Sequence, residues 1–255
     1  MHIAIITGAS SGLGRAFVQH ADQEGLDEIW VIARRLERLQ KLQTETKTPL
    51  RLLSLDLRQE TALQALENRL QTEKPVLQFL VNAAGFGKIG SFADISTSEL
   101  LSMIDLNCRA AIAITQSAIP FMPPNSHILE ICSAAAFQPI PYLSLYAATK
   151  ALLYRYSLAL GIELQPSGIS VTAVCPYWIR DTEFIGIAQQ TSNSSYIQKF
   201  PFASTEAFVA RKAWQAAKNN AAVCTPGIMA TLDHILAGLL PHRLMMSLSN
   251  VFRKL

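Results

Sequence analysis

Short apolar runs rich in β-branched residues alternate along the chain with longer stretches in which apolar positions recur at helical spacing. The runs predict strands over 3–6, 29–32, 50–55, 76–81, 127–132, 169–175 and 221–225. The helical spacing predicts helices over 15–24, 35–46, 61–73, 97–121, 143–165 and 205–219. Strands that alternate with helices are typical of a parallel sheet joined by crossover helices. We therefore predict an α/β fold with one doubly wound parallel sheet of about seven strands and helices on both faces.

The composition is compatible with a single domain over residues 1–255. Half of the 255 residues are hydrophobic, which is enough to bury a large core, and α/β folds of this size often form one domain. The formal net charge of +3 is not concentrated in a basic block, so no nucleic-acid binding is predicted. Neither the charge nor the composition indicates a second domain.

The cysteines and the apolar runs bear on the location of the protein. Four cysteines lie far apart without a CxxC pair, and three of them fall in strand-like runs, which indicates reduced, buried thiols in the cytosol. No charged-then-apolar leader precedes the first strand, and no apolar run is long enough for a spanning helix. The prediction is a cytoplasmic protein, with no metal site.

A glycine-rich turn joins the first predicted strand to the first helix. Residues 7–14 read TGASSGLG, with glycines at Gly8, Gly12 and Gly14. Between a strand and a helix, this spacing lets the backbone approach a pyrophosphate at the helix N-terminus, where unpaired N–H groups favour an anion. We therefore predict a Rossmann-like dinucleotide site made by the glycines together with Ser10, Ser11 and Leu13.

The end of the second strand predicts which dinucleotide is bound. An acidic residue about 20 positions after the glycines would hydrogen-bond a ribose 2′-hydroxyl, whereas an arginine accommodates a 2′-phosphate. The chain has Arg34 and Arg35 there, which favours NADP(H) over NAD(H). Arg34 is the first choice for the phosphate contact and Arg35 the second. The alternative is that both arginines lie in a solvated first helical turn.

A hydroxyl, a phenol and an amine occur together between residues 133 and 150. Tyr146 and Lys150 are four residues apart, so on a helix they share one face. A nearby ammonium group would lower the pKa of a phenol toward neutrality, where it can transfer a proton. Ser133 directly follows a predicted strand and would lie at the carboxyl edge of the sheet, where open α/β folds bind ligands. These residues predict proton transfer to a carbonyl oxygen.

In the order and spacing of these motifs, from about residue 3 to residue 227, the chain resembles the short-chain dehydrogenases/reductases. The resemblance rests on TGxxxGxG at residues 7–14, NAAG at 82–85, the serine and the YxxxK pair. It implies a catalytic tetrad of Asn107, Ser133, Tyr146 and Lys150. In this family the asparagine kinks its helix and holds a water that connects the lysine to solvent.

The resemblance also implies cofactor contacts from the third and fourth strands. Asp56 would hydrogen-bond the adenine amino group and Leu57 would lie beside the ring, although Asp56 could instead cap the helix that follows. The small residues of NAAG would let the chain pass close to the adenosine ribose, which adds Asn82, Ala83 and Gly85 to the predicted contacts. Asn82 would also tie neighbouring strands together. Tyr146 and Lys150 would contact the nicotinamide end.

After the sixth strand the chain departs from the family pattern. Pro176 and Thr182 match residues that contact the nicotinamide, but Tyr177 replaces the usual glycine. Tyr177 and Trp178 could form an aromatic wall for an apolar substrate or be ordinary packing. Residues 177–205 correspond to the family's substrate lid, which must move to admit ligand.

The tail over 228–255 is apolar with late basic residues. It could lie on a membrane surface, but packing over the active site or in a subunit interface is the favoured interpretation.

The predicted function is NADP(H)-dependent reduction of a ketone or aldehyde to an alcohol, or the reverse oxidation. Tyr146 would supply the proton, Ser133 would bind the developing oxyanion and Lys150 would bind the nicotinamide ribose. The alternatives are a catalytically silent NADP-binding sensor or scaffold and a lipid-carbonyl reductase at a membrane surface. The expected partner is a small carbonyl or alcohol substrate, and the resemblance implies a homodimer or homotetramer.

Overall fold

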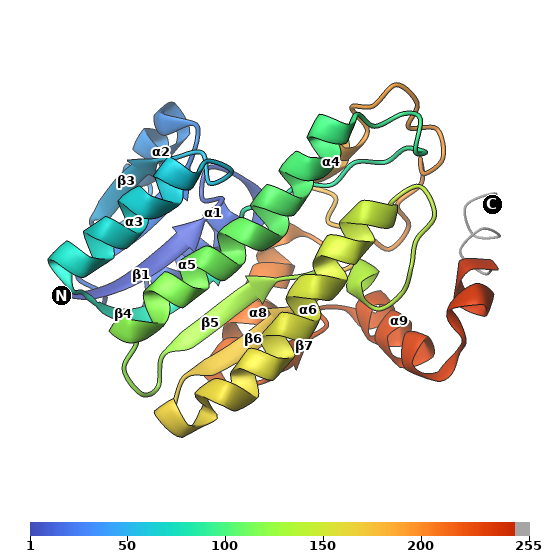
Figure 1. Cartoon of the computed structure of the whole chain (residues 1–255). Helices are drawn as coiled ribbons and strands as arrows, with labels where there is room; N and C mark the ends of the chain where they lie inside the picture. Colours follow the sequence, from blue (N-terminus) through green and yellow to red (C-terminus); the bar gives the residue numbers. More distant parts are fainter. Residues whose placement is uncertain (248–255) are drawn as a thin grey trace.

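The computed structural model describes residues 1–247, which contain a sheet of seven parallel strands in the order β3-β2-β1-β4-β5-β6-β7 (Figure 1). This confirms the predicted doubly wound α/β fold. The strands are β1 His2–Thr7, β2 Glu28–Ala33, β3 Leu50–Ser54, β4 Val76–Asn82, β5 His127–Ile131, β6 Ser170–Val174 and β7 Val223–Cys224.

Helices cover both faces of the sheet (Figure 1). On one face, α1 (Gly12–Ala21), α2 (Leu36–Gln43) and α8 (Glu206–Lys218) bury Phe17, Leu39 and Trp214 against the strands. On the other face, α3 (Glu60–Glu73), α5 (Ala111–Ala118) and α6 (Ser144–Leu164) do the same with leucines and Ile114. Further helices are α4 (Thr97–Ile104), α7 (Phe184–Ala188) and α9 (Ile228–Leu239). The two apolar layers hold the sheet between them.

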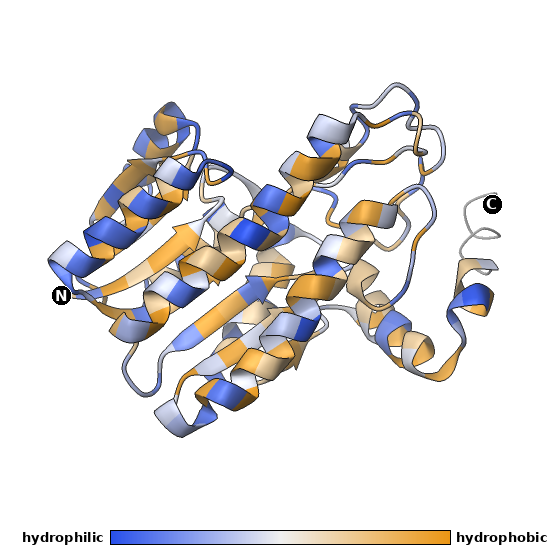
Figure 2. Cartoon of the chain, viewed as in Figure 1, coloured by the Kyte–Doolittle hydropathy of each residue, from blue (hydrophilic) through white to orange (hydrophobic). Residues whose placement is uncertain are grey.

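The central strands are apolar on both sides, as Figure 2 shows by colour. In β1 every residue after His2 is buried, and β2 is buried from Ile29 onward. A strand covered by helices on both faces must be apolar at successive positions rather than at alternate ones. That is why continuous runs, and not alternating patterns, located these strands in the sequence.

The strand order reverses between β1 and β4, because β1 pairs with β2 on one side and with β4 on the other. Crossover connections leave in opposite directions from such a pair, which opens a crevice at the carboxyl ends of the strands. Thr7, at the end of β1, bridges the two strands: its hydroxyl donates to the Val81 carbonyl (3.4 Å) and accepts from the Ala84 N–H (3.0 Å). The fold thus places the turns after β1 and β4 side by side.

The long helix predicted over 97–121 is divided in the structure. A π-helical segment, Asp105–Ala110, separates α4 from α5 and contains Asn107. A π-helical turn admits an extra residue, and its side chain is then aimed differently from those of the flanking α-helix. The last strand, β7, is also shorter than predicted because only Val223 and Cys224 pair with β6.

The C-terminal helix α9 lies beyond the sheet, at the edge where the strands end (Figure 1). The part of the predicted tail over 248–255 lies outside the described residues. Among residues 1–247, no helix is both long enough and apolar enough to cross a membrane. All four cysteines are buried and unpaired, as predicted.

Candidate functional site

A cavity of about 770 Å³ occupies the crevice at the carboxyl ends of the strands. Its walls come from the glycine turn, the ends of β2 to β6, the segment after β6 and helix α9. Among the predicted cofactor residues, those that line it are Gly8, Ser10, Ser11, Gly12, Leu13, Gly14, Arg34, Arg35, Asp56, Leu57, Ala83, Gly85, Tyr146, Lys150, Pro176 and Thr182. The predicted residues therefore converge from distant parts of the chain.

The glycine turn leaves no room for side chains. Gly8 has a φ of +68°, and a Cβ there would lie 2.9 Å from the Ala83 carbonyl oxygen. A Cβ on Gly14 would lie 2.3 Å from the Gly8 oxygen. The start of α1 faces the cavity, and its N-cap residue Ser11 makes no side-chain capping bond. The first helical N–H groups are therefore available to an anion, as a diphosphate requires.

Of the two candidate arginines, the structure brings Arg35 to the glycine turn. Its Nη2 donates to the hydroxyl oxygens of Ser10 (3.2 Å) and Ser11 (2.9 Å), and its Nη1 lies 2.9 Å from Glu183 Oε2. Arg34, the first choice from the sequence, is exposed at the rim of the cavity. Arg35 is half-buried, so it is not simply part of a solvated first turn.

Asp56 does not cap the following helix. Helix α3 begins after Gln59, which is its N-cap residue, so the capping interpretation of Asp56 is wrong. The Asp56 carboxylate instead accepts from the Arg58 N–H (3.2 Å) and from its guanidinium Nε (2.9 Å), and Arg58 also lines the cavity. The Arg58 side-chain hydrogen bonds lower the pKa of Asp56. The sequence pattern did not single out Arg58, although an arginine two residues after a strand-terminal Asp can bind it.

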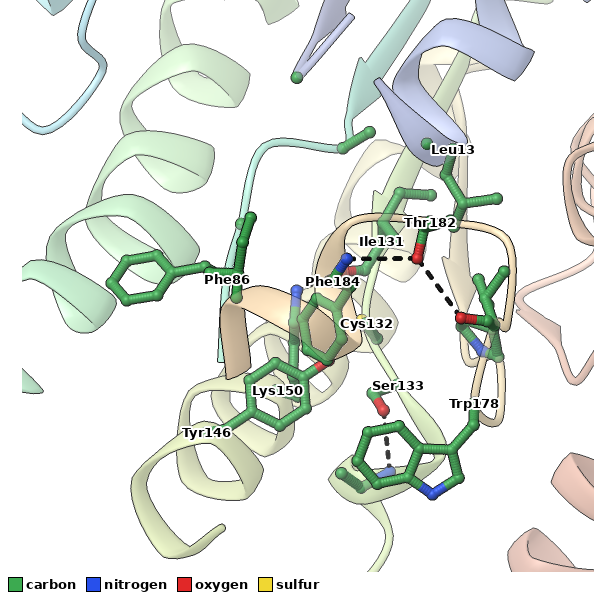
Figure 3. Close-up of a pocket in the computed structure, with 18 of the residues that line it drawn as sticks. Leu13, Phe86, Ile131, Cys132, Ser133, Tyr146, Lys150, Trp178, Thr182 and Phe184 are labelled. Carbon is green, nitrogen blue, oxygen red and sulfur yellow. Dashed lines mark hydrogen bonds between the residues drawn. The ribbon is translucent and has the colours of Figure 1, made fainter. Parts of the chain in front are cut away.

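Ser133, Tyr146 and Lys150 lie together in the cavity (Figure 3). Ser133 directly follows Cys132 after β5, and its hydroxyl accepts a hydrogen bond from the Ala135 N–H (3.1 Å). Tyr146 and Lys150 share a face of α6, with the ammonium nitrogen 5.8 Å from the centre of the phenol ring. The structure therefore brings the three predicted side chains together in one cavity.

The predicted lowering of the Tyr146 pKa by Lys150 is wrong. Burial raises the pKa of Tyr146 above its ordinary value, and the hydrogen bond with Ser133 opposes that rise only in part. The Lys150 ammonium donates to the Ile131 carbonyl (2.6 Å), and burial lowers the pKa of Lys150 itself. Desolvation disfavours the charged forms of both side chains. Tyr146 is therefore held as a neutral phenol, the form that donates a proton.

Asn107 joins the loop after β4 to helix α6. Its Nδ2 donates to the Phe86 carbonyl (2.9 Å) and to Thr149 Oγ1 (3.1 Å), and its Oδ1 accepts from the Phe86 N–H (3.0 Å). A Cβ on Gly85 would lie 3.0 Å from this Oδ1 and 3.5 Å from the Lys150 nitrogen. Asn107 therefore lies next to Lys150 without lining the cavity. The water that Asn107 is expected to hold between the lysine and solvent stays a prediction.

Asn82, which was predicted to contact the cofactor, lies beneath the cavity rather than in its wall. Its Nδ2 donates to Thr115 Oγ1 and to Glu130 Oε1, both at 2.8 Å, and Thr115 also donates to Glu130 at 2.7 Å. These bonds tie β4 to β5 and α5, as also predicted. Burial raises the pKa of Glu130 to about 7.

The segment after β6 closes the cavity from the other side. Thr182 Cγ2 would lie 3.3 Å from a Cβ on Gly12, so this segment approaches the glycine turn directly. The ring of Phe184 packs 5.3 Å from that of Tyr146 (Figure 3). Tyr177 and Trp178 both line the cavity, as an aromatic wall requires.

An acidic residue of this segment, Glu183, bridges the lid to the cofactor side. It pairs with Arg35 at 2.9 Å and with Arg38 at 2.7 Å. The hydrogen bond from Arg38 and the charges of both arginines lower the pKa of Glu183. The sequence pattern did not single out Glu183 and Arg38, which are separated by 145 positions. No local pattern could have paired them.

Comparisons with known proteins agree with this geometry. The family profile described as short chain dehydrogenase matches residues 2–192. The chain belongs to this family of oxidoreductases. It is 30% identical over 188 residues to the NADP-dependent 3-hydroxy acid dehydrogenase YdfG of Escherichia coli, covering 72% of this chain and 75% of that one.

Two solved structures show the same fold over nearly the whole length of this dehydrogenase. A short-chain dehydrogenase from Sphingobium yanoikuyae in complex with NADPH is 27% identical, with a TM-score of 0.79 over 97% of this chain and 96% of that one. A bulky-bulky ketone specific alcohol dehydrogenase from Comamonas testosteroni is 26% identical, with a TM-score of 0.75 over 94% and 93%. The family resemblance read from the sequence is confirmed.

The described residues of this dehydrogenase fit a dinucleotide. A diphosphate fits the glycine backbone at Gly8 and Gly14 and the open N-terminus of α1. A further phosphate fits Arg35, which lies beside the turn. When bound, a nicotinamide dinucleotide supplies or accepts the hydride. The cavity continues from the glycine turn to Tyr146 and Ser133, so both ends of such a molecule would meet the predicted residues.

Proposed function

We propose that this dehydrogenase uses NADP(H) to reduce a ketone or aldehyde to an alcohol, or catalyses the reverse oxidation. The observation that carries the proposal is that the Ser133 hydroxyl and the Tyr146 phenol lie together in the wall of the cavity, beside Lys150 (Figure 3). Two hydroxyl groups that converge in this way can both bind one carbonyl oxygen. NADPH is bound by the Sphingobium relative, and Arg35 supports the same choice here.

Each catalytic side chain has a distinct role in this proposal. Tyr146, held neutral by burial, donates its proton to the carbonyl oxygen as negative charge develops there. Ser133 donates a hydrogen bond to the same oxygen. Lys150 lines the same cavity, with its ammonium nitrogen 5.8 Å from the centre of the phenol ring, and would bind the nicotinamide ribose. Asn107 fixes the backbone of Phe86 next to Lys150.

The shape of the substrate end favours a bulky apolar carbonyl compound. Trp178, Phe184 and Phe200 form an aromatic group, with Trp178 and Phe200 4.6 Å apart at their ring centres. The Comamonas relative is specific for ketones with two bulky substituents. A wide apolar cavity binds such ketones through buried area rather than through many polar contacts.

Replacement of Tyr146 by Phe tests the proposal. We expect kcat for NADPH-dependent ketone reduction to fall by about 10²–10⁴-fold, because the proton donor is lost. The matched control is Tyr154→Phe, which removes a phenol from the same helix outside the cavity. NADPH oxidation over a panel of bulky ketones and NADPH binding by fluorescence are the measurements. Binding of NADPH without turnover of any carbonyl or alcohol would favour a silent sensor instead.

We further propose that two copies pair through α4 and α6. These helices carry apolar side chains that face solvent in the single chain, with exposed fractions of 56% for Leu101, 44% for Leu152 and 72% for Ile162. Exposed apolar groups on neighbouring helices are typical of subunit contacts. Light scattering of the protein and of an Ile162→Glu variant tests this, since the charge would favour the monomer.

A further inference from the structure

One carboxyl group of the cavity wall lies among side chains that are mostly apolar. Helix α9 contributes this group, Asp233, together with Met229, Leu232 and Leu236. The wall continues with apolar side chains from the loop before α6 and from the lid, namely Ile140, Leu143, Trp178, Phe184, Ile187 and Ile197. A carboxyl in such a wall is costly unless a partner compensates it.

Asp233 differs from the other carboxyls of the cavity in its partners. Asp56 is paired with Arg58, Glu183 with Arg35 and Arg38, and Glu99 with Lys88. Each of these carboxyls is thus neutralised by a cation within its own part of the wall. Among residues 1–247, the hydrogen bond recorded for the Asp233 carboxyl comes instead from a neutral amide, Gln138 Nε2, at 3.1 Å.

The surroundings of Asp233 leave its carboxylate able to accept a hydrogen bond from a ligand. Burial raises the pKa of Asp233 to about 6, and no cation of the described residues offsets this rise. The group is therefore still charged at neutral pH. Gln138 Oε1 is also buried and has no hydrogen-bond partner among the described residues. Asp233 and Gln138 are hydrogen-bonded to each other and both line the cavity, so the Asp233 carboxylate is the acceptor that this pair presents there.

The attachment of α9 does not require a carboxylate at this position. The neighbouring His234 stacks on Phe137, with the ring centres 4.4 Å apart, and its Nε2 lies 3.4 Å from the Tyr154 hydroxyl. Ala230 is fully buried against the body of the protein. These contacts lie outside the cavity, so Asp233 is the member of α9 that presents a charge to the cavity.

We propose that Asp233 and Gln138 form a polar subsite for a second polar group of the substrate, distinct from the reacting carbonyl. The subsite accepts a hydrogen-bond donor, either an ammonium or a hydroxyl group, at the end of an apolar body. It disfavours carboxylic acids, because the Asp233 carboxylate would repel a second carboxylate placed beside it. This inference rests on the proposed function and names the substrate class of that site.

A matched series of ketones tests the subsite. The three members share one apolar body and end in a methyl, an ammonium or a carboxylate group. With the natural protein we expect kcat/KM to be highest for the ammonium-ended ketone, and at least about tenfold higher than for the carboxylate-ended one. In Asp233→Asn the amide oxygen can still accept from Gln138, but the charge is gone. The ammonium-to-carboxylate ratio of kcat/KM should then fall at least about tenfold.

The control is His234→Gln, which alters the attachment of α9 outside the cavity. A purely structural effect of Asp233→Asn would change all three ketones alike, as this control should, and would overturn the proposal. So would a natural protein that prefers the carboxylate-ended ketone.

The test remains informative if no ketone is reduced, which would contradict the proposed function alone. The same compounds can then be titrated against the protein with NADPH, with intrinsic tryptophan fluorescence as the readout, because Trp178 lies in the wall. Tighter binding of the ammonium than of the carboxylate compound, reversed or abolished in Asp233→Asn, would support the subsite. Equal binding of the two compounds would overturn it.

Discussion

The two ends of the cavity are built in different ways. At the cofactor end, backbone meets backbone: Gly8 and Gly14 lie so close to Ala83 and to each other that no Cβ could be added. At the substrate end, the lid and α9 present side chains, and Gly186 in the lid has no atom within 4 Å of its would-be Cβ. The backbone packing at the cofactor end suits a ligand whose structure is constant. At the substrate end, the cavity can be altered by replacing one side chain at a time.

The two ends of the cavity also differ in how firmly they are held to the rest of the protein. The glycine turn continues from β1, whose residues after His2 are buried. The lid is held partly by exposed or half-exposed pairs, such as Glu183 with Arg38 and Ser192 with Asp94, and partly by the buried side chains of Ala188 and Ile197. Exposed pairs separate at a lower cost in free energy than buried contacts do. We therefore expect the lid to open more easily than the glycine turn.

The largest expected effect is the difference in free energy of unfolding between Gly14→Ala and Gly186→Ala. A Cβ on Gly14 would lie 2.3 Å from a backbone oxygen, so we expect the free energy of unfolding to fall by about 3 kcal/mol or more. Gly186 lies in α7 with free space around it, so alanine should be neutral or stabilise by up to about 1 kcal/mol. Denaturant unfolding measures both. Similar values for the two variants would contradict the contrast between the ends.

A second prediction concerns pH and the buried Glu130 beneath the cofactor end. Its pKa is raised from 4.5 to about 7 by burial, so the folded protein binds its proton more tightly than the unfolded chain does. Its contribution therefore favours the folded state most at low pH and is lost as the pH rises through 7. The full difference corresponds to about 3 kcal/mol.

Glu130→Gln removes this dependence. Between pH 5 and pH 8, the natural protein should lose about 2–3 kcal/mol of unfolding free energy relative to the variant. Thermal or denaturant unfolding over this pH range is the measurement. Glu163→Gln, which removes a charge from an exposed position on α6, is the control and should follow the natural protein. Parallel curves for the natural protein and Glu130→Gln would refute the prediction.

The smallest effect should come from the arginines that follow β2. Arg35→Gln should weaken NADPH binding by about 10- to 100-fold and NADH binding much less, because charge-assisted bonds to a phosphate would be lost. Arg34→Gln, at the exposed rim, should have the weaker effect. Titration of each variant with NADPH and with NADH measures the two affinities. A larger loss in Arg34→Gln would restore the first choice made from the sequence.

Local sequence was sufficient where one short segment carries both the structure and the chemistry. The glycine turn, the strand before Ser133 and the Tyr146–Lys150 spacing each lie within a few residues, so the backbone alone brings their members together. Continuous apolar runs located the strands because buried parallel strands have no polar face. The break in the helix at Asn107 could be stated only from the family resemblance.

The sequence by itself determined the sheet, the glycine turn and the candidate catalytic residues, since these depend on hydrophobic pattern and on short spacings. Only the tertiary structure decided which arginine meets the turn, that Asn82 supports strands rather than the cavity wall, and that burial raises the pKa of Tyr146. It also paired Glu183 with Arg38 and placed Asp233 beside Gln138. The physical reason is that burial and charge pairing depend on segments far apart in the chain, and packing alone sets their distance.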